Sequence, residues 1–264
     1  MRVVLTHPEP RVVALAAALR GRGHAVLELP LRRLTSLLDA PEVRAQLRMA
    51  ADYDWLAFVS PGAVEAALPA LLGAGRWQPR RGIALIGPGT EAALRARGLA
   101  PAPACRWVRP ARPPFDADAL LREPAFDIGA GGSLLVVRGE TGRDDWLEAL
   151  RARGALVDIA AVLRSAPIEP GQTALGQAGR WLREAAAEPV AFVFTTVDAI
   201  DRLDRALAHD ERGAACALAV HPRQVARLRA LGWARAELLE PGEAGLLAGI
   251  ESTGSARRAR SASG

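Results

Sequence analysis

The sequence predicts an α/β protein built from two similar doubly wound parallel-sheet domains with a cleft between them. Short apolar runs alternate with segments of helical periodicity, which is typical of parallel sheets. The stretch at 56–68 returns at 192–203, an offset of 192 − 56 = 136, and the stretch at 83–100 returns at 217–234, an offset of 217 − 83 = 134. Periods of this length indicate duplication of one domain rather than a solenoid.

The chain opens with a predicted strand at 3–5, a helix at 11–20 and a second strand at 26–29. The first strand has a counterpart at 135–138, which is a third repeated pair. Pro30 closes the second strand. Because the stretch after it is irregular, we predict a crossing into another domain there.

The central element is the strand, turn and helix at 56–68. Its apolar run ends at Val59, Ser60 has a side chain that caps helices, and Pro61 suits the first helical position. The free backbone N–H groups at a helix start attract anions, and ligands of open parallel sheets bind beyond the carboxyl ends of the strands. This turn is therefore expected to lie at a ligand site.

The other elements follow from periodicity, proline and glycine. In chain order we predict a helix at 41–49, a strand at 83–86, a helix at 91–97, a proline-rich loop at 100–115, a short helix at 116–121, a strand at 134–137, a helix at 146–153, a strand at 157–163, a second crossing at 164–173, a helix at 175–187 and a last helix at 246–250. Residues 251–264 are small, polar and basic without periodicity, and we expect them to be disordered.

The composition is that of an ordinary globular chain of 264 residues, half of them apolar, with a net charge of +5. Arg257, Arg258 and Arg260 against Glu251 account for +2, which leaves +3 for residues 1–250. This mild excess favours small acidic ligands over a nucleic-acid surface. All 34 basic residues are Arg, so neither a Schiff-base lysine nor a phosphate-loop lysine is available.

Cys105 and Cys216 have no Cys-x-x-Cys partner, and we interpret both as unpaired residues of a reducing compartment. The amino end has too short an apolar stretch for a secretory signal, and no run approaches the ~18 apolar residues of a membrane span. A cytoplasmic protein is expected.

Six predicted strand ends carry groups that could bind a ligand. They are Thr6-His7, Ser60, Gly87 to Thr90, Arg138 to Arg143, Thr195-Thr196 and His221-Pro222-Arg223. Hydroxyl groups at matching strand ends of both halves are what a cleft for oxyanions would have.

Each candidate also has a structural interpretation. Ser60 and Thr90 could serve as helix caps. Arg138 and Arg143 could lie in a solvated loop, or present their forks to a carboxylate. His221 could be a structural residue or a ligand contact, and a metal site is not expected because the four histidines are scattered.

The chain has no Ser/His/Asp order, paired catalytic carboxylates or metal-ligand spacing. An enzyme that mainly folds a reactive substrate can act through orientation and oxyanion contacts, with no strong motif. The stretches DYDWLAFVSPGAVEAAL, IALIGPGTEAALRARG, LLVVRGETGRDDWLEALRARGALVD and FVFTTVDAI together resemble the uroporphyrinogen-III synthase family over nearly all of residues 1–250.

The resemblance implies a discontinuous domain one at 1–34 plus 170–250 and a domain two at 38–165. It implies cyclisation of hydroxymethylbilane, a linear tetrapyrrole with an acetate and a propionate on each ring, with inversion of the last ring. Loss of the terminal hydroxyl gives an azafulvene cation, attack by the last ring gives a spiro intermediate, and rearrangement gives the III isomer. The family uses no cofactor or metal.

Carried over by motif, the resemblance implies that Ser60, Thr90 and Thr196 line the cleft and that Arg138 and Arg143 belong to an RGExGR loop. We predict that Thr90 and Thr196 are catalytic. The predicted substrate-binding residues are Ser60, Gly87, Arg138, Gly139, Arg143, Thr195 and His221. The chain has Leu163 where the family often has Tyr, and His7 where Arg is common.

The alternative is a non-catalytic two-domain sensor that closes on an acidic small molecule. Nucleic-acid binding through the arginines would instead be strongly salt-dependent. We expect hydroxymethylbilane as the partner, with transient hand-over from hydroxymethylbilane synthase, a monomeric state, and neither a membrane nor a nucleic-acid partner.

Overall fold

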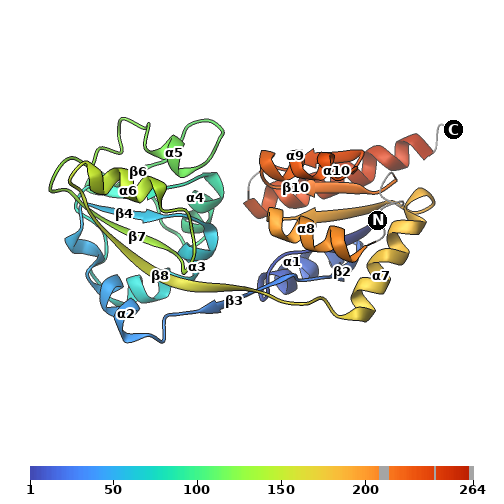
Figure 1. Ribbon diagram of the computed structural model, residues 1–264, viewed down its shortest axis with the longest axis horizontal. Coiled ribbons are helices and arrows are strands. Elements are labelled where there is room, and N and C mark those ends of the chain that lie inside the picture. The colour runs from blue at the N-terminus through green and yellow to red at the C-terminus, as the bar shows by residue number, and fades with distance from the viewer. Residues whose placement is uncertain (208–213, 241, 262–264) are drawn as a thin grey trace. The chain divides into compact units, whose positions relative to one another are not determined.

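The computed structural model describes residues 1–207, 214–240 and 242–261. The chain forms two compact units, which we name unit 1 (Met1–Leu34 with Ala166–Gly264) and unit 2 (Thr35–Ser165). Figure 1 shows that each unit has its own sheet with helices packed against it.

The strands are short and mostly apolar. They are β1 (Arg2–Leu5), β2 (Ala25–Glu28), β3 (Arg32–Ser36), β4 (Trp55–Phe58), β5 (Gly82–Leu85), β6 (Arg106–Val108), β7 (Ser133–Gly139), β8 (Leu156–Pro167), β9 (Val190–Phe194), β10 (Cys216–Ala219) and β11 (Arg235–Leu238). The helices are α1 (Arg11–Arg20), α2 (Pro41–Arg48), α3 (Pro61–Gly73), α4 (Pro88–Arg95), α5 (Ala117–Leu120), α6 (Asp145–Ala152), α7 (Gln172–Arg183), α8 (Val197–Ala206), α9 (Pro222–Ala230) and α10 (Gly242–Ser261), with 3-10 turns at Ala50–Asp52 and Glu184–Ala186.

The two sheets have the same strand order. Unit 1 has the order β11-β10-β9-β1-β2, and unit 2 has β6-β5-β4-β7-β8 with β3 added beyond β8. All the ladders among the five matched strands of each sheet are parallel. The predicted fold class is confirmed, and the matched order extends the sequence repeats to whole sheets.

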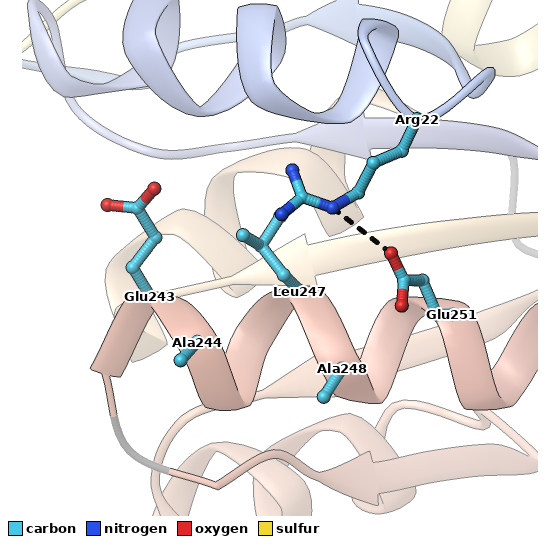
Figure 2. A pocket seen from close by; sticks show the side chains of 6 residues that line it. All are labelled: Arg22, Glu243, Ala244, Leu247, Ala248 and Glu251. Carbon is cyan, nitrogen blue, oxygen red and sulfur yellow. Dashed lines mark ion pairs between the residues drawn. The ribbon is translucent and has the colours of Figure 1, made fainter.

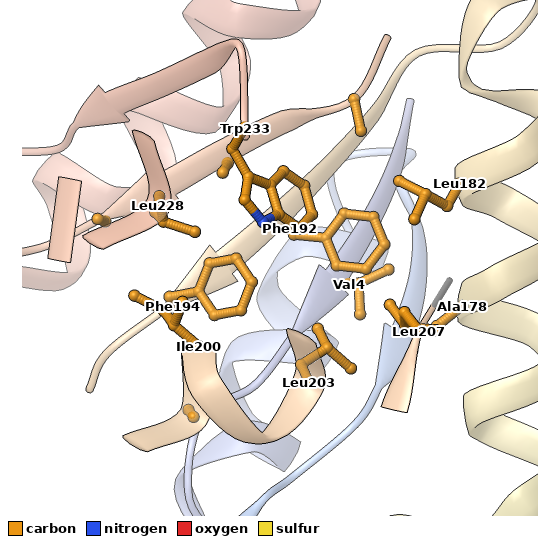
Figure 3. Packing of buried hydrophobic residues seen from close by; sticks show 14 of the residues in the cluster. Val4, Ala178, Leu182, Phe192, Phe194, Ile200, Leu203, Leu207, Leu228 and Trp233 are labelled. Carbon is orange, nitrogen blue, oxygen red and sulfur yellow. The ribbon is translucent and has the colours of Figure 1, made fainter. Parts of the chain in front are cut away.

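Helices cover both faces of the unit 1 sheet because successive side chains of each strand point to opposite faces. Val4 packs with α7, α8 and α9, whereas Val3 and Leu5 pack with α1 and α10. Phe192 and Phe194 of β9 enclose Trp233, with ring centroids 5.3 and 5.8 Å from the indole (Figure 3). Phe192 and Phe194 are the largest fully buried side chains among the described residues of unit 1.

Unit 2 has the same two-sided core. Leu56 and Phe58 pack with α2, α3 and α4, and Trp55 and Ala57 pack with α5 and α6. Trp55 also packs edge-on against Phe126, with ring centroids 5.1 Å apart. Both units are therefore doubly wound.

Three strands were missed by the sequence patterns. The stretch at 100–115 was predicted as a loop, but β6 lies within it and pairs with β5. Strands β3 and β11 were not predicted either. All three lie at sheet edges, where half of the strand faces solvent and no continuous apolar run is needed.

The prediction of a disordered tail is wrong for residues 251–261, because α10 continues to Ser261. Ala and Arg favour helix formation, so the helix continues without an apolar stripe. The Thr253 hydroxyl donates to the Gly249 carbonyl at 2.8 Å within this helix. Midway along its length, α10 pairs with the turn after α1 through Glu251 and Arg22, which are 3.1 Å apart (Figure 2). Residues 262–264 lie outside the described residues.

Within the described part of the chain, no helix is both long and apolar enough to cross a bilayer.

Candidate active site

The carboxyl edge of each sheet has a point where the strand order reverses. It lies between β7 and β4 in unit 2 and between β1 and β9 in unit 1. Helices that follow these neighbouring strands pack on opposite faces, and ligands of open α/β sheets bind at such points. The predicted site residues at these edges are Ser60, Gly87, Thr90, Arg138, Gly139 and Arg143 in unit 2, and Thr195, Thr196 and His221 in unit 1.

Ser60 begins α3 at the reversal point of unit 2. Its Oγ accepts a hydrogen bond from the Ala63 backbone N–H at 3.2 Å, so the residue caps the helix. The Val59 N–H donates to the Val137 carbonyl at 3.3 Å, which joins the ends of β4 and β7. The hydroxyl proton of Ser60 remains a donor, because a cap uses only the oxygen lone pair.

Gly87 and Thr90 form the next turn of this edge. A Cβ at Gly87 would lie 3.0 Å from the Phe115 Cβ, so the close approach of this loop favours glycine. Thr90 is only 3% exposed, and no hydrogen bond of its hydroxyl is found within the described residues. The hydroxyl is thus held in place by packing and keeps its hydrogen-bonding capacity.

Glu91 anchors the start of α4 from beside Thr90. Its carboxylate accepts from Arg109 at 2.5 Å and pairs with Arg95 at 2.7 Å. Burial acts to raise the pKa of Glu91, but the hydrogen bonds from Arg109 and Arg95 outweigh it and lower the pKa. An ionised carboxylate in the first turn also stabilises the helix through its dipole.

Arg138 ends the apolar part of β7 and is 7% exposed. Its Nη1 donates to Asp144 Oδ1 at 2.5 Å and to the Arg143 carbonyl at 3.3 Å. Its Nε is buried without a hydrogen-bond partner among the described residues. Asp144 begins α6, but its side chain makes no capping bond because it binds this guanidinium.

Arg143 lies on the outside of the same loop, with 48% of its side chain exposed. Its guanidinium contacts Asp145 at 3.2 Å and Asp118 at 3.3 Å. The hydrogen bond to Asp145, together with the Asp118 charge, raises the pKa of Arg143. Of the two predicted arginines, the sheet buries one and presents the other to solvent.

The unit 1 edge is built from Thr6, Thr195 and Thr196. The Thr6 hydroxyl donates to the Val193 carbonyl at 2.8 Å, which ties the end of β1 to β9. Thr196 begins α8, and its Oγ1 accepts from the Ala199 N–H at 3.0 Å. Thr196 therefore repeats the capping role of Ser60, and its hydroxyl proton is likewise available.

His221 and Gln224 form the turn after β10. The His221 Nδ1 accepts from the Arg223 N–H at 3.1 Å, so the imidazole caps α9. Gln224, 6% exposed, donates from Nε2 to the Thr195 carbonyl at 2.7 Å and accepts at Oε1 from the Val220 N–H at 3.0 Å. Gln224 thereby joins the ends of β9 and β10. Sequence reasoning missed it, although it stands 134 residues after Thr90 in the repeat.

His7 follows Thr6 at this edge. Burial, with the Arg11 charge nearby, lowers the pKa of His7 to about 4. The imidazole is therefore neutral at pH 7. Its Nδ1 has no hydrogen-bond partner within the described residues.

The sheet registers make His7 and Arg138 equivalent. Val4 lies opposite Phe192 as Leu135 lies opposite Leu56, which sets an offset of 135 − 4 = 131. Adding 131 to 7 gives 138. One reversal point has a neutral imidazole and the other a guanidinium.

Among the described residues, no group of three or more His, Cys, Asp or Glu side chains could hold a metal ion. Cys105 and Cys216 are both buried, and neither forms a disulfide within the described residues. What the two edges offer to a ligand is hydroxyl groups, backbone N–H groups of helix starts and the Arg143 guanidinium. These groups bind oxyanions.

These features define a class of protein, a duplicated α/β fold whose two carboxyl edges are suited to anionic ligands. The model of the family described as uroporphyrinogen-III synthase HemD matches residues 13–248. The chain belongs to the uroporphyrinogen-III synthase family, whose members are enzymes of tetrapyrrole synthesis.

Solved structures agree on the fold. A mutant uroporphyrinogen III synthase from the extremely thermophilic bacterium Thermus thermophilus is 20% identical, with 96% of this chain and 98% of that chain covered and a TM-score of 0.58. Uroporphyrinogen-III synthetase from Helicobacter pylori is 14% identical, with coverage of 95% and 99% and a TM-score of 0.50. At these identities the likeness establishes the two-domain α/β fold alone.

Proposed function

We propose that the chain is a hydro-lyase that closes hydroxymethylbilane to uroporphyrinogen III. A C–O bond breaks at the terminal hydroxymethyl carbon, and the hydroxyl leaves with a proton as water. The last pyrrole ring attacks the resulting azafulvene cation through its substituted carbon. Rearrangement of the spiro intermediate then inverts that ring, and loss of a proton restores its aromaticity.

The observation that carries this proposal is the recurrence of hydroxyl-capped helix starts at both sheet edges. Ser60 and Thr196 occupy equivalent positions, 196 − 60 = 136 residues apart, and each caps the helix after a central strand. A substrate with an acetate and a propionate on each ring needs many dispersed anion contacts rather than one deep pocket. The cleft predicted between the domains stays a prediction.

Thr90 and Thr196 are the residues we propose for proton transfer. The Thr90 hydroxyl is nearly buried and has no protein partner within the described residues, so it can donate to the leaving hydroxyl. The Thr196 hydroxyl accepts from a backbone N–H and can still donate its own proton. Orientation of the substrate would supply most of the remaining rate enhancement.

Hydroxyl, backbone or imidazole groups of five further residues are proposed to contact the substrate. These residues are Ser60, Gly87, Gly139, Thr195 and His221. The Arg138 to Arg143 loop is proposed to meet its carboxylates. Family membership argues against the sensor alternative. Nucleic-acid binding is not proposed, because outside the helical tail the charge excess is small.

We further propose that the protein acts in the cytoplasm as a monomer, without a metal or organic cofactor, and receives its substrate from hydroxymethylbilane synthase. Two buried cysteines that form no disulfide within the described residues fit a reducing compartment. Direct hand-over would protect the linear tetrapyrrole, which closes spontaneously to isomer I once released.

The test is incubation of the purified chain with freshly made hydroxymethylbilane, followed by chromatographic separation of the oxidised isomers. Isomer III in excess of isomer I supports the proposal, and isomer I alone contradicts it. Activity that chelator abolishes and an added metal restores would contradict the cofactor-free part.

A further inference from the structure

We propose that Arg138 is a positioning residue that holds the 139–144 loop, and that Arg143 is the guanidinium that meets the substrate's carboxylates. The inference rests on the proposed function and divides a role that sequence motifs assign to both arginines. It follows from where the two guanidinium groups lie and what already binds them.

The loop wraps around the Arg138 guanidinium. Nη1 binds the Arg143 carbonyl at 3.3 Å and Asp144 Oδ1 at 2.5 Å, two acceptors at the far end of the loop. A Cβ at Gly142 would lie 3.0 Å from the same Nη1 and 3.6 Å from Cζ, so the backbone passes directly over the guanidinium. With 8% of its side chain exposed, Arg138 has little surface left for a substrate.

The start of the loop is fixed as well. The Glu140 N–H donates to the Leu163 carbonyl at 2.7 Å, and the Glu140 carboxylate receives two hydrogen bonds from Arg164, both at 2.8 Å. The loop is thus held to β8 at its first residues and to Arg138 at its last. A loop fixed at both ends presents Arg143 in one orientation, which lowers the entropy cost of ligand binding.

Arg143 has the properties of a contact residue. Its side chain is 48% exposed, and its partners Asp118 and Asp145 are 44% and 77% exposed at 3.2–3.3 Å. Exposed ion pairs contribute little to stability, so a substrate carboxylate can replace one acceptor at small cost. The Arg138 side chain, by contrast, is only 8% exposed, and its partners are the loop's own Asp144 and Arg143 carbonyl.

Four single variants test this division: Arg138→Gln, Asp144→Ala, Arg143→Gln and, as a matched control, Arg153→Gln, which removes an exposed arginine after α6. Steady-state rates of isomer III formation give kcat and KM for each. Hydrogen exchange of the 139–144 amides, measured without substrate, reports the loop alone.

If Arg138 acts through the loop, Arg138→Gln and Asp144→Ala both raise KM several-fold and both accelerate exchange, and the double variant is no worse than either. Arg143→Gln should raise KM roughly 10- to 100-fold with slow exchange retained, because a charge-assisted contact is lost while the loop is intact. Arg153→Gln should match wild type in both readouts.

If Arg138 itself contacted the substrate, the KM of Asp144→Ala would change in the opposite direction. Asp144→Ala would then free the guanidinium and lower KM, and this result would overturn the inference, as would an unchanged KM in Arg143→Gln. Unaltered exchange in Arg138→Gln would also overturn it, independently of activity. Failure of the proposed function itself is distinguishable, because wild type would then make no isomer III.

Discussion

The carboxyl edges of the two duplicated sheets differ in what their polar side chains bind. At the position repeated after 134 residues, unit 1 has Gln224, which joins two strand ends, and unit 2 has Thr90, whose hydroxyl makes no hydrogen bond within the described residues. At the reversal point, unit 1 has the neutral His7 and unit 2 the charged Arg138. Duplication preserved the strand order, while the edge residues specialised.

Both edges have a capping hydroxyl residue, Ser60 in unit 2 and Thr196 in unit 1, and they differ at the positions around it. In unit 1 the edge side chains satisfy backbone groups, as Thr6 and Gln224 do. In unit 2 the Thr90 hydroxyl makes no hydrogen bond within the described residues, and Arg143 has only exposed carboxylates as partners. The same contrast extends to the cores, where unit 1 uses Trp233 and unit 2 uses Leu99 at the equivalent place, 233 − 99 = 134.

The largest effect is expected in the unit 1 core. Trp233→Ala should lower the free energy of unfolding by about 3–5 kcal/mol, because the indole is 3% exposed between Phe192 and Phe194. Leu99→Ala should cost about 1–2 kcal/mol, since Leu99 is only partly buried. Urea unfolding followed by circular dichroism measures both. Equal losses would show that the two cores are not specialised.

The second prediction concerns the Thr90 and Gln224 pair. Thr90→Val should slow isomer III formation by roughly 100-fold and change stability by less than about 1 kcal/mol, because it removes a donor that the fold does not use. Gln224→Leu should lower the free energy of unfolding by about 2–3 kcal/mol, because the Thr195 carbonyl and the Val220 N–H lose their partner.

Initial rates and urea unfolding of both variants check this prediction. A Thr90→Val protein that is fully active would remove Thr90 from the mechanism. A Gln224→Leu protein of normal stability would show that the unit 1 edge does not depend on this side chain, and the contrast between the edges would fail.

The third prediction uses pH to separate His7 from Arg138. The folded pKa of His7 is about 4 and its unfolded value is 6.5, so only the unfolded state takes up this proton as pH falls from 6.5 to 4. The contribution of the neutral His7 imidazole to the free energy of unfolding is therefore fully present above pH 6.5 and decreases as the pH falls below that value. Between pH 7 and pH 5, the free energy of unfolding of His7→Gln should fall by about 1–2 kcal/mol less than that of wild type.

The free energy of unfolding in urea at both pH values gives this difference directly. Other groups titrate equally in the two proteins, so they cancel. Parallel losses in wild type and His7→Gln would mean that the imidazole is protonated in the folded state, and that both reversal points are cationic below pH 6.

Much of the fold could be predicted because its central strands are buried on both faces. Strands β4 and β9 are continuous apolar runs followed by a hydroxyl residue, and this pattern survived duplication. The edge strands β3, β6 and β11 contain arginines and exposed positions, so no local pattern distinguishes them from loops. Their pairing is decided by the neighbouring strand.

The sequence predicts where the candidate site residues lie, but not which contacts their side chains make. The caps at Ser60 and Thr196 follow from residue type and the helix that comes next. The binding of Arg138 by Asp144 does not, because it depends on the path of the loop around the guanidinium. Gln224 was hidden for a similar reason, since its partners lie on two different strands.

The smallest effect is expected at the opposite edge of unit 2. Tyr53 is the only tyrosine, and it lies just before β4, at the amino end of the strand. Its hydroxyl donates to Asp158 Oδ2 at 2.8 Å. Burial and this hydrogen bond raise the pKa of Tyr53 to about 12, so the phenol keeps its proton at pH 7.

Tyr53→Phe should keep the rate of isomer III formation within about threefold of wild type, because the chemistry belongs to the carboxyl edges. A positioned general acid contributes ~10²–10⁴-fold, far more than this limit. The measurement is the initial rate of the pure variant, with its melting temperature as the control for folding. A hundredfold slower rate in a normally folded protein would move a phenol into the mechanism, and Thr90 and Thr196 would lose their proposed role in proton transfer.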